Sequence, residues 1–153
     1  MKIQLAIISD IHANIIALDA VLADISKRGI TQIYCLGDLV DFAPWGNEVI
    51  ARIQEKNILC LLGNHDQRIA FDEAIIPLPH HDVQETLNRE IAINLSKEEI
   101  SAPHKKWLAT LPYNIELTFK TGKSLRKILL VHASLQSNDK YIHQSTPKAD
   151  LSA

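Results

Sequence analysis

The stretch "NILCLLGNHD", from Asn57 to Asp66, changes character at its middle. Its first half is apolar, as in a buried β-strand, whereas its end presents a glycine, an amide, an imidazole and a carboxylate in succession. Loops at strand ends are the places where a rigid scaffold displays reactive groups. The segment therefore predicts a strand that delivers Asn64 and His65 to a functional edge of a sheet.

Two earlier segments show the same pattern. The strand predicted from Lys2 to Ser9 is followed by Asp10 and His12, and the strand predicted from Thr31 to Leu36 is followed by Asp38. Apolar residues at three- and four-residue steps predict helices between these strands, one running from residue 15 towards Gly29 and one near residues 47–56. Alternating strands and helices indicate a parallel sheet, whose carboxyl ends share one edge. We therefore expect the polar groups of all three strands to converge.

The second half has a different organisation. A loop around "IIPLPHHD" precedes helices predicted near residues 82–95 and 97–111, with Ser96 and Glu99 as a capping box for the second helix. Alternating residues from Asn114, a turn around Gly122 and the run "LRKILLVH" predict a β-hairpin that ends at His132. No repeat or linker is evident, so residues 1–153 are predicted to form a single α/β domain.

Composition excludes several classes of protein. The chain has 153 residues, 46% of them hydrophobic and 22% charged, as in ordinary soluble domains. A formal net charge of −2 offers no basic field for nucleic acid, and no segment approaches the ~18 apolar residues of a membrane span. Cys35 and Cys60 lie inside apolar runs and are interpreted as core residues, which suits a cytoplasmic location.

The residue types at the strand ends favour metal chemistry. Two divalent cations about 3.5 to 4 Å apart can clamp the oxygens of a phosphoryl transfer and activate a shared water. Aspartate, histidine and asparagine supply a mixture of oxygen and nitrogen donors that suits manganese, iron or zinc better than calcium. Any one such residue alone is more often an ordinary cap or turn residue.

Four motifs, "DIHAN", "GDLVD", "GNHD" and "VHAS", together resemble those of the calcineurin-like metallophosphoesterases, and the surrounding stretches are similar to the small bacterial phosphoesterases of that family. The resemblance implies a layered α/β/β/α sandwich and hydrolysis of a phosphate ester by a metal-activated hydroxide at a dinuclear site. By resemblance, Asp10 and His12 bind the first metal, Asp38 bridges both, and Asn64 and His132 bind the second.

The resemblance also assigns catalytic and substrate-binding groups. His65 would stand beside the scissile phosphate, protonating or stabilising the leaving oxygen, and Asn64 would face the substrate as well. Asp41 matches the aspartate of the related serine/threonine phosphatases, so we expect it to orient His65. The arginine that follows in those phosphatases is Phe42 here. Asn14 is expected to hydrogen-bond substrate.

The chain departs from the family pattern in one respect. The family's later Gly-His-x-His motif, which supplies one histidine to each metal, does not occur in the sequence. We therefore expect a truncated second sheet and one or both metals weakly bound. An open sheet edge favours a homo-oligomer. The alternative to an active enzyme is an impaired or inactive remnant that keeps the fold and partial metal or phosphate binding.

Overall fold

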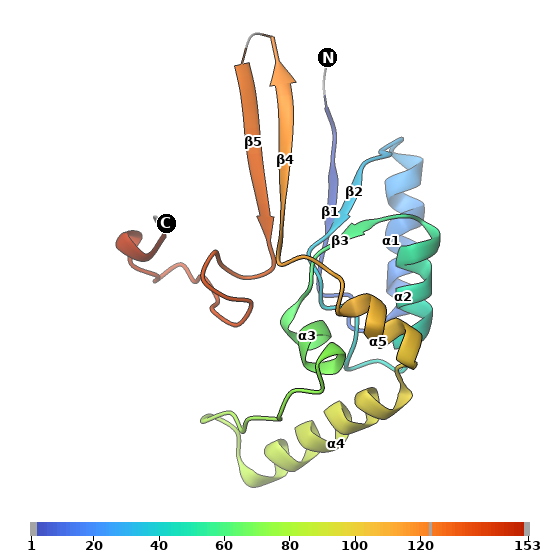
Figure 1. Ribbon diagram of the computed structural model, residues 1–153, viewed down its shortest axis with the longest axis vertical. Helices are drawn as coiled ribbons and strands as arrows, with labels where there is room; N and C mark the ends of the chain where they lie inside the picture. The colour runs from blue at the N-terminus through green and yellow to red at the C-terminus, as the bar shows by residue number, and fades with distance from the viewer. Residues whose placement is uncertain (1–2, 123, 152–153) are drawn as a thin grey trace.

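The computed structural model describes residues 3–122 and 124–151. Its first sheet contains β1 (Ala6–Ile8), β2 (Ile33–Cys35) and β3 (Leu59–Cys60), all parallel and in that order (Figure 1). The predicted parallel sheet is confirmed, although its strands are shorter than predicted, and Lys2 of the first predicted strand lies outside the described residues. Left-handed residues follow the first two strands, at Asp10 (φ 55°) and at Gly37 (φ 100°).

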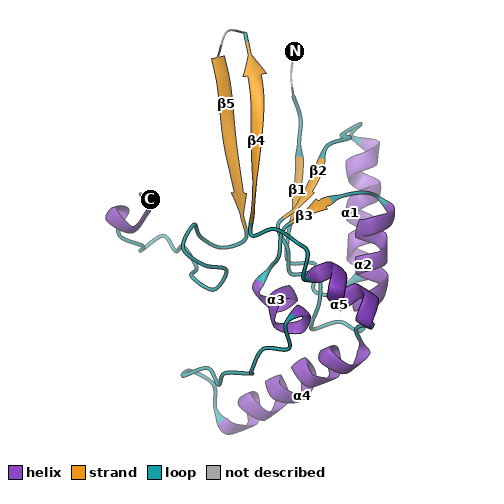
Figure 2. Ribbon diagram, viewed as in Figure 1, coloured by secondary structure: helices purple, strands orange, loops and turns teal. Residues whose placement is uncertain are grey.

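Two crossover helices cover one face of this sheet (Figure 2). They are α1 (Ile15–Lys27) and α2 (Gly46–Glu55), close to their predicted positions. Ile50 and Ile53 of α2 are completely buried and belong to the main core, which also contains Cys35 of β2. Both cysteines of the chain are buried and unpaired, as predicted. These crossovers place the carboxyl ends of all three strands on the same side.

Three helices follow the sheet: α3 (Asn64–Ala70), α4 (Val83–Glu99) and α5 (Ala102–Leu108). The sequence did not predict α3, which begins directly at the end of the third strand segment. None of the helices that the structure describes combines the length and the apolar content needed to cross a membrane.

The capping box predicted for the second of the later helices is wrong. Ser96 and Glu99 lie within α4, which continues through them to its end. The box belongs instead to the start of α4, where the Asp82 side chain accepts from the backbone N–H of Glu85 and the Glu85 carboxylate accepts from that of Asp82. The two predicted helices are therefore present, but the break between them lies at Ile100 and Ser101 and not at Ser96.

The predicted hairpin is confirmed as β4 (Asn114–Thr121) and β5 (Ser124–Val131), and a short 3-10 turn follows at Lys148–Leu151. The base of the hairpin packs on the sheet face opposite α1 and α2, through a second core of Leu61, Leu117 and Leu130. The layers are therefore helix, parallel sheet and hairpin, with the second sheet reduced to two strands (Figure 1).

Two glycines allow the loops after β2 and β3 to touch. Gly37 has φ +100°, and a methyl group on it would lie 2.7 Å from the Gly63 Cα and closer still to the Gly63 nitrogen.

We expect Gly37→Ala to destabilise the protein by about 2 to 3 kcal/mol, from backbone strain and this clash. Urea denaturation measures the loss. Gly29→Ala is the matched control for strain alone, because Gly29 has φ +68° but open space around it. Equal losses in the two variants would contradict the clash.

Candidate metal centre

Side chains from the first two strand ends meet in one cluster. Ligand atoms of Asp10, His12 and Asp38 all lie within 4.8 Å of one another. Nε2 of His12 is 3.9 Å from Asp10 Oδ1 and 3.9 Å from Asp38 Oδ2. Asp10 is exposed whereas Asp38 is buried, so the cluster opens to solvent on the Asp10 side. Two carboxylates and an imidazole at these distances fit a divalent cation such as manganese, iron or zinc.

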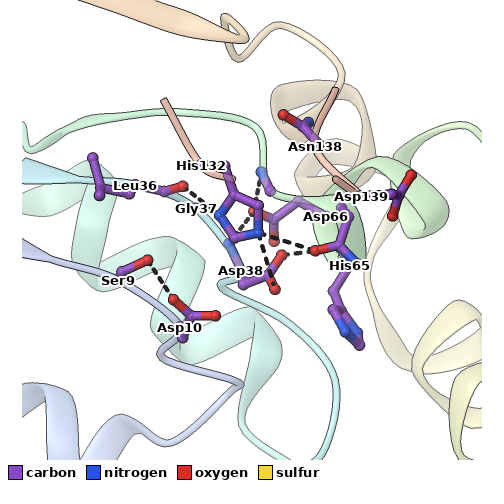
Figure 3. Close-up of polar contacts among 12 residues, drawn as sticks. Ser9, Asp10, Leu36, Gly37, Asp38, His65, Asp66, His132, Asn138 and Asp139 are labelled. Atoms are coloured by element: carbon purple, nitrogen blue, oxygen red, sulfur yellow. Dashed lines mark hydrogen bonds and ion pairs between the residues drawn. The ribbon is translucent and has the colours of Figure 1, made fainter. Parts of the chain in front are cut away.

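The other two predicted ligands are Asn64 and His132, and Figure 3 shows His132 beside Asp38. Nε2 of His132, which follows β5, is 3.4 Å from Asp38 Oδ2 and 3.0 Å from Asn64 Oδ1. The imidazoles of His12 and His132 therefore approach the same carboxylate oxygen, Asp38 Oδ2, at 3.9 and 3.4 Å. The structure brings all five predicted ligands together, and their roles as ligands stay predictions.

Backbone carbonyl groups fix the ring orientation of two histidines in this cluster. Nδ1 of His12 lies 3.1 Å from Val40 O, and Nδ1 of His132 lies 2.8 Å from Leu36 O. Both rings donate Nδ1–H to these carbonyls and therefore turn Nε2 towards Asp38. Such anchoring of the second ring nitrogen is typical of metal-binding histidines.

His65 is held in a different way. Its Nδ1 lies 2.7 Å from Asp41 Oδ2, while its backbone N–H donates to Asp38 Oδ1. Asp41 is only 4% exposed, and its Oδ1 is buried without a hydrogen-bond partner among the described residues. The carboxylate that the sequence assigned to orient His65 is therefore in contact with that imidazole.

The sequence analysis missed Arg68. Arg68 lies in the last turn of α3, and its Nη1 is 3.6 Å from Asp41 Oδ2, so the helix that the sequence did not predict delivers a cation to the Asp41–His65 pair. Phe42 is 77% exposed, and its ring centre lies 4.6 Å from that of His12, edge to face, and 5.3 Å from that of His65. A helix predicted from Asn64 would have placed Arg68 one turn from His65.

Asp66 forms hydrogen bonds with the backbone of two loops around the centre. It is completely buried, and its carboxylate accepts the backbone N–H groups of Asp38 and Leu39 at 2.8 Å and of Gly63 at 3.1 Å. Asp66 lies in the first turn of α3, where it caps Gly63, and it also holds the loop after β2 through Asp38 and Leu39. One side chain therefore joins the loops after β2 and β3.

Burial and neighbouring charges shift three pKa values here. Burial is the main cause that raises the pKa of Asp66 to about 7, and the charge of Asp38 adds to it. The three backbone N–H donors lower this pKa, but by less. Burial opposes a charged His132, but its contact with Asp38 prevails and raises its pKa to about 9. Burial raises the pKa of Asp38, but the contacts with His132 and His65 outweigh burial, so the pKa of Asp38 is lowered overall. A cation bound here would compete with the His132 proton.

The loops around the centre carry an unusual backbone. Eight described non-glycine residues have positive φ, and six of them lie in these loops: Asp10, His12, Ala13, Asp38, Asp41 and Phe42. Left-handed conformations of such residues cost roughly 1 to 3 kcal/mol each and persist where the surroundings fix them, often at functional sites. The favourable contacts of the rest of the fold therefore offset this cost and hold these side chains in place.

Asn14 and one surface hollow lie apart from the predicted metal ligands. Asn14 caps α1, its side-chain oxygen accepting from the Ala17 backbone N–H, and a substrate contact for its amide stays a prediction. A hollow of about 510 Å³ is lined by residues such as Arg52 and Thr31, at the opposite end of the strands. This hollow is therefore separate from the candidate metal centre.

Carboxylates and imidazoles gathered at the carboxyl edge of a parallel sheet define a candidate metallohydrolase. Residues 3–150 match the calcineurin-like phosphoesterase family, and the chain belongs to that family. An uncharacterised protein of Methanocaldococcus jannaschii is 38% identical over 134 residues, which cover 88% of this chain and 51% of the relative. Members of the family hydrolyse phosphoesters with divalent metal ions, so the centre described above is the place to expect them.

Solved structures support the fold. A metallophosphoesterase from Sphaerobacter thermophilus matches with a TM-score of 0.62 and 27% identity, over 93% of this chain and 52% of that one. A hypothetical protein from Pyrococcus horikoshii matches with a TM-score of 0.67 and 23% identity, over 97% and 62%. The chain spans about half the length of the curated relative that it matches.

Proposed function

We propose that this chain hydrolyses a phosphate ester at the centre around Asp38, with two divalent cations. The observation that carries the proposal is that Nε2 of His12 and Nε2 of His132 both approach Asp38 Oδ2, at 3.9 and 3.4 Å. Asp10 and His12 would hold one cation, Asn64 and His132 the other, and Asp38 both. Manganese, iron and zinc suit these donors. Family membership supports the general activity.

When bound, two cations would activate water and neutralise charge on the phosphate oxygens. The chain's own groups supply the remaining chemistry. With Nδ1–H held by Asp41, His65 keeps its Nε2 for the substrate. A proton on that nitrogen can pass to the leaving alkoxide as the ester bond breaks, so His65 acts as general acid. Asp41 orients the ring and stabilises the imidazolium.

A direct test combines hydrolysis with metal binding. The purified chain is assayed with a chromogenic phosphomonoester and phosphodiester, alone and with manganese, iron or zinc, beside the variant His65→Asn. We expect metal-dependent turnover that falls by about 10² to 10⁴ in His65→Asn, the range for loss of a general acid. Metal binding measured by calorimetry should be unchanged in the variant. Absence of turnover with every metal would contradict the proposal.

The rival function is an inactive remnant that binds metal or phosphate. It is favoured by the ligand set: of the residues that the structure describes, only Asp10, His12 and Asp38 form a cluster of three carboxylate or imidazole ligands. Under this alternative the folded chain would bind cations at one site and show no turnover. The same assay therefore separates the two functions.

Asp41→Asn tests the positioning role. The asparagine oxygen can still accept from His65 Nδ1, but the negative charge is lost, so we expect kcat to fall by about 10- to 100-fold with little change in metal affinity. Glu98→Gln, which makes the same carboxylate-to-amide change at an exposed position of α4, is the control. An unchanged kcat in Asp41→Asn would contradict the role of Asp41.

We further propose that residues 1–153 form one domain, that the protein acts in the cytoplasm, and that it self-associates. Buried free thiols at Cys35 and Cys60 suit a reducing compartment. In the described chain β4 and β5 pair only with each other, so both outer edges of the hairpin can pair with a second copy. Sedimentation equilibrium tests this: we expect a dimer, and a monomer at all concentrations would contradict it.

A further inference from the structure

A second cavity lies beside the metal centre. It measures about 320 Å³, within the range of small-molecule sites of roughly 300 to 1,000 Å³. Gln67 and Ser134 contribute to its wall, two positions after His65 and His132 respectively. A ligand in this cavity can therefore be continuous with a phosphate at the metal centre.

Asn138 presents a fixed acceptor to this cavity. The side chain is only 7% exposed, and its Nδ2 donates to Leu62 O at 2.8 Å and to Gln67 Oε1 at 3.4 Å. These two bonds settle which end of the amide is oxygen, because a flipped amide would place oxygen against oxygen. No described residue donates to Asn138 Oδ1, so this oxygen is left for a ligand. Gln67 is itself held by Glu73, at 2.7 Å.

Asp139 adds a second acceptor. It lines the cavity next to Asn138, over the helix that carries His65 (Figure 3). Its carboxylate forms no hydrogen bond or ion pair with a described residue. Its backbone is fixed, because its N–H donates to Ser137 Oγ at 3.1 Å. Asp139 is exposed, so both acceptors stand on one ordered loop where a ligand with donor groups can reach them.

The rest of the lining defines the class of ligand. No lysine or arginine lines the cavity, and Asp139 would repel an anion, so a phosphate or carboxylate is disfavoured here. Tyr113, 53% exposed, offers an aromatic face for stacking. A flat neutral group with N–H donors fits, and an amino-bearing nucleobase combines these properties. Guanine presents adjacent N–H and NH₂ donors that match a carboxylate in bidentate fashion.

We propose that this cavity binds the amino-bearing base of a nucleotide, as the leaving-group subsite of the phosphoesterase. The inference rests on the proposed function for the phosphate end of the ligand. Base recognition itself depends on Asn138, Asp139 and Tyr113 and needs no metal. The substrate class is thus a nucleotide with its reacting phosphate near His65.

Nucleosides test the subsite without any turnover. Guanosine is titrated to about 10 mM into the ¹⁵N-labelled chain without metal, a range that detects the weak affinity of a single small group. We expect shifts of the amide signals of residues 134–139 and of the Asn138 side-chain NH₂. Inosine, which lacks the amino group, should bind about tenfold more weakly, and Asp139→Asn should weaken guanosine by about tenfold or more. The control Glu98→Gln removes an exposed carboxylate on α4 and should bind normally.

Each outcome decides a different point. No guanosine binding, or equal binding by Asp139→Asn and Glu98→Gln, would overturn the subsite, even in a chain that hydrolyses a chromogenic ester. Guanosine binding by a chain that hydrolyses no ester with any metal would overturn the proposed function while the base site stands.

Discussion

Asp38→Asn is expected to abolish phosphoester hydrolysis, with a loss of more than about 100-fold, the upper cost of changes that only support a metal ligand. Asp38 is 2% exposed, and its Oδ2 is approached by Nε2 of both His12 and His132. Its replacement keeps the shape and an oxygen for the His65 backbone N–H, but removes the charge that would hold both cations. Hydrolysis assays and calorimetry with manganese measure the two losses.

Asp24→Asn is the control for this change. Asp24 forms an exposed ion pair with Arg28 on α1, far from the centre, so its loss should leave turnover and metal binding unaltered. Circular dichroism should show that both variants stay folded. Full activity in Asp38→Asn would contradict both the bridging role and the dinuclear site.

Asp66→Ala is expected to have the largest effect on stability, between about 3 and 5 kcal/mol. The change leaves three buried backbone N–H groups without an acceptor, each at a cost of about 1 to 3 kcal/mol, together with a small cavity. Urea denaturation at neutral pH measures the loss. Asp66→Asn should lose less free energy of unfolding than Asp66→Ala, because the asparagine side chain still has one oxygen that accepts hydrogen bonds.

Asp24→Ala is the matched control, since Asp24 lies on α1 and pairs with Arg28 at the surface. We expect its unfolding midpoint to stay close to that of the parent chain. A midpoint for Asp66→Ala as high as that of the control would show that the loops after β2 and β3 do not depend on the buried carboxylate.

The sequence predicted the features that depend on periodicity and order along the chain. Alternating strands and helices identified the parallel sheet, and this placed Asp10, Asp38 and Asn64 on one edge before any coordinates were considered. Alternation on both sides of Gly122 identified the hairpin. These signals are local, and the convergence of strand ends follows from sheet geometry alone.

Features that depend on tertiary contacts were not predicted. Arg68 reaches Asp41 only because α3 starts without a linker after β3, and no periodicity marks a helix of seven residues. Ala13 has φ 56°, a left-handed conformation that no sequence pattern around it indicates. Backbone conformation at these positions is decided by the surrounding loops, which sequence spacing does not describe.

The turn at residues 36–39 has a consequence for any redesign of this protein. Its carbonyl and amide groups anchor His132 through Leu36 O and Asp66 through Asp38 N and Leu39 N. A shift of this one turn would therefore displace groups contributed by strands far apart along the chain at the same moment. Libraries that vary its length or sequence should yield variants that lose thermal resistance and cation affinity together, and seldom one without the other.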